Sequence, residues 1–139
     1  MADLIYDKFK EYLGDGTIDL DDDTLKIILL ADTYSPDSTD AVYADIIASE
    51  IAAGSGYSTG GATLANVTWA DTAGVTTLDA DDPVWSTASF TARYAAVYSD
   101  TPESPADPLI CMLDFGANKT GQGGNFYITL HEDGLLTST

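Results

Sequence analysis

The chain has few of the residues that most often build reactive or cross-linked sites. Its 139 residues include one cysteine and one histidine. A single cysteine excludes an intrachain disulfide, and Cys111, inside the apolar run LICML, is expected to be a small buried hydrophobic residue. A lone histidine excludes a metal site made of several histidines, and neither CxxC nor HExxH occurs. We expect His131 to be a strand-end residue.

Basic residues are also scarce. Five Lys and Arg stand against 23 Asp and Glu, which gives a net charge of −18. This charge repels phosphate backbones and anionic membranes, so we expect neither nucleic acid nor membrane as a partner. No run approaches the roughly 18 apolar residues of a membrane span. The first residues, MADLIYDKFKEYLG, carry acidic side chains and no uninterrupted apolar core, so we expect no signal peptide and synthesis in a cytoplasm.

Length and a hydrophobic content of 45% predict one globular domain, residues 1–139, with its own core. Within the N-terminal segment 1–14, apolar residues at helical spacing predict an amphipathic helix that starts at Asp3 and is ended by Gly14. A second short helix is expected over residues 40–48. Both helices precede the part of the chain that is rich in strand-like patterns.

Strand-like runs fill most of the remaining sequence. Thr17–Leu20 and Thr24–Ala31 are expected to form a hairpin, and the nearly continuous apolar run in its second arm suits a strand buried on both faces. The later strand-like runs are ATLANVTWA, VTTLDA, PVWS, SFTARYAAVYSD, PLICMLDFG and GNFYITLHEDG. About eight strands separated by turn clusters predict a mainly β fold, an antiparallel, jelly-roll-like β-sandwich with the two short helices.

The acidic stretch IDLDDDTLKIILL resembles the start of a calcium loop. Asp19, Asp21 and Asp23 have the alternate spacing of the first ligands. Thr24 occupies the position that requires glycine, and Leu30 occupies the position that requires a carboxylate. The sequence therefore predicts an acidic turn before a strand, with the three aspartates as candidates only for weak binding of a surface cation.

Other motifs do not assemble a reactive site. The glycine-rich segment GSGYSTGG, residues 54–61, lacks the lysine and the following helix of a phosphate loop, and it is expected to be a flexible loop. The cluster DADDP is explained by turn chemistry, and no GxSxG elbow is present. Arg93 is expected to pair with an aspartate across a sheet, or to contact another subunit. We predict a protein without catalytic residues, cofactor or metal.

The strand block resembles small virion structural proteins of tailed bacteriophages. The resemblance rests on EIAAGSGYSTGGATLANVTW, LDADDPVWSTASFTARYAAVYSDT and PLICMLDFGANKTGQGGNFYITLHEDGLLT, with the motifs GYxxGG and TARYAxxY. Members of this group often open with a YDKFKEYLGDG-like helix and an IDLDDDTLKIILL-like strand, as this chain does. The resemblance covers nearly the whole chain and implies a capsid decoration (cement) protein or a tail component.

A decoration protein on the outer capsid surface suits the charge, because the packaged genome is a polyanion that repels an acidic protein. The resemblance implies the major capsid protein as partner, and decoration proteins commonly form homotrimers. Contact residues are expected in the helix, the loop and a strand, at Phe9, Tyr12, Tyr57 and Arg93. The alternatives are a tail or baseplate component and a carbohydrate-binding module for host attachment.

Overall fold

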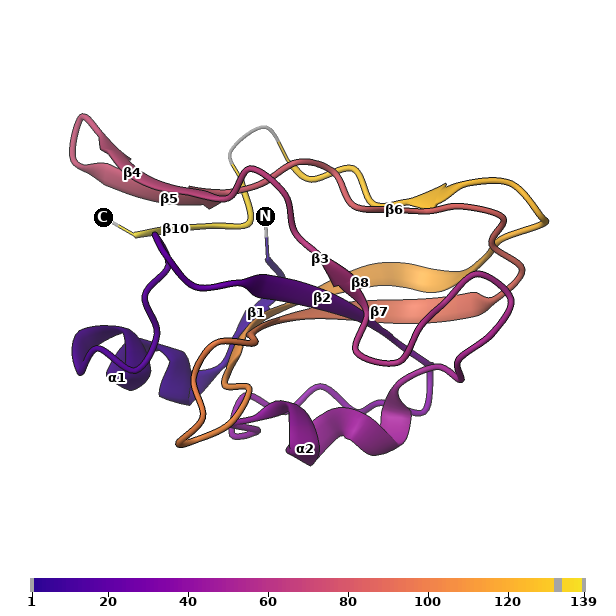
Figure 1. The fold of residues 1–139 in the computed structure, drawn as a ribbon, viewed down its shortest axis with the longest axis horizontal. Helices are drawn as coiled ribbons and strands as arrows, with labels where there is room; N and C mark the ends of the chain where they lie inside the picture. The colour runs from indigo at the N-terminus through magenta and orange to yellow at the C-terminus, as the bar shows by residue number, and fades with distance from the viewer. Residues whose placement is uncertain (1, 132–133, 139) are drawn as a thin grey trace.

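The computed structural model describes residues 2–131 and 134–138 and is mainly β, as the sequence predicts (Figure 1). The elements in chain order are β1 (Leu4–Ile5), α1 (Asp7–Gly14), β2 (Leu25–Leu30), α2 (Tyr43–Ile46), the 3-10 helix η1 (Ile47–Ser49), β3 (Ala62–Thr63), β4 (Thr68–Thr72), β5 (Val75–Asp79), β6 (Val84–Trp85), β7 (Thr91–Ser99), β8 (Leu109–Thr120), β9 (Phe126–Tyr127) and β10 (Leu136–Ser138). None of the helices in these described residues has the length and apolar character needed to cross a membrane.

The strands form one large sheet and two small ones, and all their pairings are antiparallel. The main sheet has the order β1-β8-β7-β2-β3, and the small sheets are β10-β5-β4 and β6-β9. In Figure 1 the two small sheets lie above the main sheet and α2 lies below it, while α1 lies beyond one end of the sheet, where its Phe9 joins the core shared with the small sheets. Both faces of the main sheet are therefore covered, in agreement with the predicted layered β architecture with two short helices.

Strand β2 is buried on both faces, which confirms the prediction from its apolar run. Leu25, Ile27 and Leu29 belong to the larger core, which also contains residues of the small sheets. Ile28 and Leu30 point to the opposite face and join a second core with residues of α2. Alternate residues of a strand face opposite sides of its sheet, so a fully apolar run supplies two cores at once.

The N-terminal helix begins later than the sequence predicts. Leu4 and Ile5 form β1 and pair with Met112 and Cys111 of β8, so the chain is extended where a helix was expected. The helix starts at Asp7, after Tyr6, and ends at Gly14 as predicted. A pairing with a strand more than 100 residues away in the sequence thus overrides local helical periodicity.

The predicted hairpin before β2 is wrong in its first arm. Thr17–Leu20 forms no strand, because both edges of β2 are already occupied by β7 and β3. Ile18 and Leu20 are instead buried in the larger core, and the N–H of Ile18 donates to the carbonyl of Tyr12 at 3.0 Å. The alternation of apolar and polar residues over residues 17–20 therefore reflects the burial of Ile18 and Leu20 in a connecting segment, not a strand.

The glycine-rich segment 54–61 contains no helix or strand, but it is anchored rather than free. The Tyr57 side chain is only 2% exposed. Its hydroxyl donates to Oε2 of Glu50 at 2.6 Å and accepts the N–H of Leu29 at 3.2 Å. The N–H of Gly60 also donates to Oε2 of Glu50, at 2.9 Å. The expectation of a flexible loop is therefore corrected, because these contacts fasten the segment to β2.

Candidate functional site

The candidate site begins with an irregularity in β8. Ala92 pairs with Lys119 and Tyr94 pairs with Asp114, so the four residues 115–118 of β8 face the single residue Arg93 of β7. A bulge of this kind bends its strand and changes the direction of its side chains. Beyond Asp114 the strand therefore leaves the core, and residues 116–120 are exposed.

Polar contacts of Asp114 hold the bulge in place. Its Oδ1 accepts Nε of Arg93 at 3.1 Å, and the same oxygen accepts the N–H of Gly116 at 2.8 Å. The N–H of Asp114 donates to Oδ2 of Asp3 at 2.7 Å. The Gly116 N–H, followed by the Arg93 guanidinium, holds the pKa of the Asp114 carboxyl below its usual value. The pairing of Arg93 with an aspartate across the sheet is thereby confirmed.

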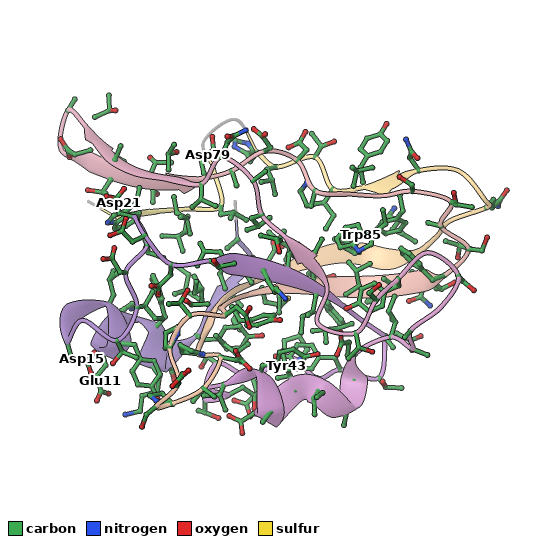
Figure 2. All side chains as sticks on the ribbon, in the orientation of Figure 1. Glu11, Asp15, Asp21, Tyr43, Asp79 and Trp85 are labelled. Carbon is green, nitrogen blue, oxygen red and sulfur yellow. The ribbon has the colours of Figure 1, made fainter. Side chains whose placement is uncertain are left out.

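An aromatic cluster connects the bulge to the core. Phe115 lies 6.3 Å from Phe126, measured between ring centroids, and Phe126 lies 4.9 Å from Phe90 and 6.1 Å from Trp85. Trp85 belongs to β6, and its side chain is buried in the core between that small sheet and the main sheet (Figure 2). Such ring contacts add to the stabilisation gained from buried area, so the aromatic cluster holds the rings of Phe115 and Phe126 in place.

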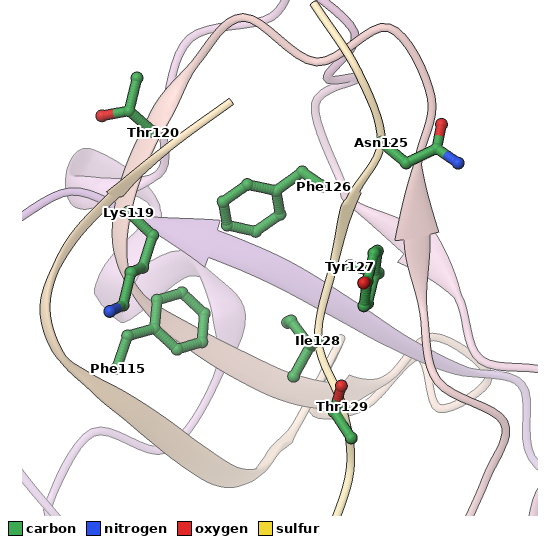
Figure 3. Close-up of a pocket in the computed structure, with 8 residues that line it drawn as sticks. All are labelled: Phe115, Lys119, Thr120, Asn125, Phe126, Tyr127, Ile128 and Thr129. Atoms are coloured by element: carbon green, nitrogen blue, oxygen red, sulfur yellow. The ribbon is translucent and has the colours of Figure 1, made fainter. Parts of the chain in front are cut away.

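A groove of about 450 Å³ runs between β8 and the segment that contains β9, and we name it the β8–β9 groove. Its lining residues are Phe115, Lys119, Thr120, Asn125, Phe126, Tyr127, Ile128 and Thr129. In Figure 3 Phe115, Phe126 and Ile128 face one another inside the groove, and Lys119 and Thr120 lie on the β8 side. A second hollow of about 240 Å³ shares Phe115, Ile128 and Thr129 and extends the groove toward Asp3.

The outer face of the β6–β9 sheet carries two exposed apolar side chains beside this groove. Val84 and Tyr127 are direct cross-strand partners and are 51% and 64% exposed. The other exposed large hydrophobic residues in the described part of the chain are Ile47, which is 51% exposed, and Ile5, which is 36% exposed. Val84, Tyr127 and the β8–β9 groove together form what we call the apolar patch. Exposed apolar side chains beside a groove make this face the candidate interaction surface of the described chain.

The chemistry of the patch suits binding. Its floor offers aromatic and aliphatic contact, and its rim offers the Lys119 ammonium, two threonine hydroxyls and the Asn125 amide. Lys119 forms no ion pair with a described carboxylate, in contrast to Lys8, Lys26 and Arg93. Asp114 is held as a carboxylate by the contacts above, so it is a poor proton donor near neutral pH.

The three aspartates of the acidic stretch do not converge on a common point. Oδ1 of Asp19 accepts the N–H of Asp21 at 3.0 Å, and Oδ2 of Asp23 accepts the N–H of Asp19 at 3.0 Å. Oδ2 of Asp23 also accepts the hydroxyl of Ser99 at 2.8 Å. Two of the three carboxylates thus stabilise a turn at the start of β2, and Asp21 lies at the outer surface (Figure 2). Within residues 2–131 and 134–138, no group of three metal-ligating side chains is gathered.

The predicted contact residues divide into buried and exposed ones. Phe9 is 3% exposed and Tyr57 is 2% exposed, so both belong to the core of the chain and their expected role at an interface is corrected. Tyr12 is half-buried against the same core. Arg93 retains 29% of its side-chain exposure beside the bulge. The sequence offered no signal that Val84 would be exposed opposite Tyr127.

The lone cysteine and histidine have different surroundings. Cys111 is fully buried, as predicted, and burial raises the pKa of its thiol to about 12. His131 is exposed and lines the smaller hollow, four residues beyond the end of β9. The expectation that it ends a strand is therefore wrong, because only Phe126 and Tyr127 of that segment pair with β6.

Sequence reasoning missed a polar cluster around Glu50. Its carboxylate accepts the hydroxyls of Tyr43 and Tyr57, and the Tyr98 hydroxyl donates to the carbonyl of Gly60 at 2.8 Å. Burial, followed by the bond to Glu50, raises the pKa values of Tyr43 and Tyr57, so both stay protonated donors. Figure 2 shows Tyr43 between α2 and the main sheet. The cluster is explained by its structural role in fastening α2 and the glycine-rich segment.

Comparison with known proteins gives no relative from which a function could be transferred. No protein family, no curated protein and no solved structure matches this chain.

Proposed function

We propose that the chain is a non-enzymatic capsid decoration protein of a tailed bacteriophage, which binds the outer surface of the assembled head through the apolar patch. The observation that carries this proposal is the exposed pair Val84 and Tyr127 beside the β8–β9 groove. The setting comes from the resemblance of the strand block to phage virion proteins. The groove contributes a rigid docking surface for contact with capsid subunits.

Charge supports the outer rather than the inner capsid surface. The chain carries −18 net charges, and a dense packaged genome repels such a protein. The same charge keeps free copies soluble until they reach the capsid. Binding that depends on a small apolar patch then remains selective, because the rest of the surface resists non-specific association.

The patch has the composition of an interaction hot spot. Aromatic residues contribute most to binding when they lie near a preformed pocket that excludes water. Tyr127 provides an exposed aromatic ring, and Phe115 and Phe126 provide the floor of the neighbouring groove. Because the aromatic cluster already orders these rings, docking loses little side-chain entropy.

The test is binding of the purified chain to phage heads that lack it, measured by co-sedimentation and by cryo-electron microscopy. The matched variants are Tyr127→Ser in the patch and Ile47→Ser at η1, since both remove an exposed apolar side chain, 64% and 51% exposed. We expect Tyr127→Ser to weaken binding by roughly tenfold or more and Ile47→Ser to leave it unchanged. Equal affinities of the two variants, or no binding of the unaltered chain, would refute the proposal.

The copy number separates the proposed role from a tail or baseplate role. A decoration protein occupies many equivalent sites on the head and raises its resistance to heat. A tail component is present in few copies or in stacked rings. Density for this chain on the tail, with none on the head, would replace the capsid assignment.

Carbohydrate binding is a second candidate because Tyr127 presents an exposed ring. Aromatic rings with an apolar body and a polar tip are suited to surfaces that are partly wet, and Asn125 and Thr129 supply hydrogen-bonding groups nearby. A glycan array with the unaltered chain and Tyr127→Ser tests this candidate. It is supported only by hits that the variant loses, and an array without hits ends it.

A further inference from the structure

The β4–β5 hairpin forms a three-stranded sheet with β10, and its turn extends beyond the rest of the upper layer (Figure 1). Its five residue pairs run from Thr68 with Asp79 to Thr72 with Val75, without a register shift. The turn residues Ala73 and Gly74 have φ values of 54° and 88°, as in the tight turns that suit β-hairpins. Four of the five residues of β4 are exposed.

One edge of β4 has no strand partner in the described part of the chain, since the order of its sheet is β10-β5-β4. In the tight turn, the carbonyl of Thr72 and the N–H of Val75 face each other. Hydrogen-bonded and non-hydrogen-bonded pairs alternate along an antiparallel ladder. The backbone groups of Trp69 and Asp71 therefore point away from β5, toward the open edge.

Apart from the carboxylate of Asp71, this edge lacks the devices that usually prevent pairing with another chain, such as lysine, proline, bulges and very short strands. Its sequence is TWADT, and its register is regular. The other open edges differ. β1, β3, β6 and β9 have two residues each, β10 has three, and the open part of β8 contains the bulge and Lys119.

We propose that β4 pairs with β4 of a second copy of this chain in an antiparallel arrangement centred on Ala70. In that register Trp69 lies opposite Asp71 of the second copy, and Thr68 lies opposite Thr72 of the second copy. The outward N–H and carbonyl groups of Trp69 and Asp71 then all find partners. Threonine pairs across strands are favourable, and like charges directly opposite are unfavourable. In this register no aspartate faces an aspartate.

Self-complementarity is the reason for choosing a second copy as the partner. The five residues of β4 can pair with the same five residues of an antiparallel second copy. A twofold axis through Ala70 then pairs the open β4 edges of both copies with each other. The result is a closed dimer with a continuous six-stranded sheet rather than a growing fibre. The charge of −18 on each copy opposes association, so dimerisation must strengthen as salt screens the repulsion. This inference is independent of the proposed function, and it predicts a dimer where the resemblance implies a homotrimer.

A disulfide trap tests the register. The central Ala70 pair is non-hydrogen-bonded, with Cα atoms about 4.5 Å apart, which lies within disulfide range. Ala70→Cys should therefore cross-link on mild oxidation. The matched control Thr72→Cys, equally exposed on β4, would face Thr68 of the second copy and should stay mainly monomeric. Equal cross-linking of both variants, or none of either, would overturn the proposed register.

A pair of substitutions at Asp71 tests the backbone pairing without a cross-link. Asp71→Ala and Asp71→Pro both remove the carboxylate, but only proline lacks the outward N–H, and proline is tolerated on an open strand edge. Analytical ultracentrifugation at 0.05 and 0.5 M NaCl measures the dimer, with circular dichroism as a folding control. We expect Asp71→Ala to dimerise at least as well as the unaltered chain and Asp71→Pro to have a Kd about 30-fold higher.

Three results would contradict the dimer. The first is equal Kd values for Asp71→Ala and Asp71→Pro. The second is a mass of 14.7 kDa for the unaltered chain at the highest attainable concentration in high salt, and the third is a trimeric mass for the unaltered chain. If Ala70→Cys fails to fold, the Asp71 variants and the unaltered chain still decide the question.

Discussion

The most specific stability prediction concerns Gly61, which lies where the glycine-rich segment enters β3. Its φ is +79°, in the region that side chains other than hydrogen disfavour. A Cβ built at this position would lie 2.0 Å from the carbonyl oxygen of Ile27 and 2.7 Å from its carbonyl carbon. These are backbone atoms of the central strand β2, so no side-chain rotation can relieve the overlap in Gly61→Ala.

The expected cost has two parts. The left-handed conformation costs an alanine roughly 1–2 kcal/mol. Relief of the overlap requires β3 to move away from β2, which breaks the pairing of Ala62 with Ile27 and of Thr63 with Lys26. Two backbone hydrogen bonds at about 1 kcal/mol each add roughly 2 kcal/mol. Gly61→Ala should therefore lower the free energy of unfolding by about 3–4 kcal/mol.

The matched control is Gly16→Ala. Gly16 has a φ of +85°, close to that of Gly61, but a Cβ there meets no atom within 4 Å. Both variants share the conformational cost and the loss of unfolded-state entropy that accompanies Gly→Ala. Urea unfolding of both should show Gly61→Ala less stable by about 2 kcal/mol. Unfolding free energies that agree within about 0.5 kcal/mol would refute the argument from close approach to β2.

Three further predictions follow from single contacts. Tyr57→Phe removes the hydroxyl that bonds the Leu29 N–H and the Glu50 carboxylate, so it should lower the free energy of unfolding by about 1–3 kcal/mol. The control Tyr127→Phe, at an exposed position, should change it by less than about 0.5 kcal/mol. Equal effects of the two variants would contradict the structural role of the Glu50 cluster. Cys111 should react with a thiol reagent at pH 8 only at the rate of unfolding, because it is fully buried with a raised thiol pKa; rapid labelling of the folded chain would disprove this. A calcium chelator should leave the melting temperature unchanged, and a loss of several degrees would reinstate a metal site at residues 19–23.

The sequence predicts those parts of the fold in which one local pattern has one structural outcome. The apolar run of β2 indicated burial on both faces, and both cores contain its residues. A turn separates the ends of the runs ATLANVTWA and VTTLDA as expected, although it is confined to Ala73 and Gly74 because Asp71 and Thr72 pair within β4. Arg93, isolated among acidic residues, found the partner across the sheet that its surroundings favoured. In these cases tertiary structure reinforces the local preference.

Prediction failed where a distant partner decides the conformation. Ile5 has helical spacing with Phe9, yet Leu4 and Ile5 pair with an open edge of β8 and form a strand. The run from Phe126 to His131 alternates like a long strand, but β6 offers pairing only to its first two residues. Phe9 and Tyr57 were expected at an interface because they lie in the N-terminal helix and the glycine-rich loop, and only the packed structure shows that both enter the core.

The candidate site could not be predicted for the same reason. Phe115 and Phe126 are 11 residues apart in sequence, and their contact depends on the bulge that four β8 residues form against Arg93. The bulge in turn requires the bonds of Asp114 to Gly116 and Asp3. The local sequence DFG does not indicate a bulge, because its hydrogen-bond partner Asp3 lies near the other end of the chain.

Both surfaces proposed for interaction arise from one property of the fold. The upper layer is divided into the β4–β5–β10 sheet at one end and the β6–β9 sheet at the other, instead of one continuous sheet over the core (Figure 1). A short sheet of two strands leaves the side of the core open along β8, and this opening is the β8–β9 groove. The second short sheet ends in β4 with its outer backbone groups unpaired within the described chain. Because the two features lie on separate sheets, we expect the proposed dimerisation through β4 to leave the groove accessible, so that variants in either feature abolish one interaction without loss of the other.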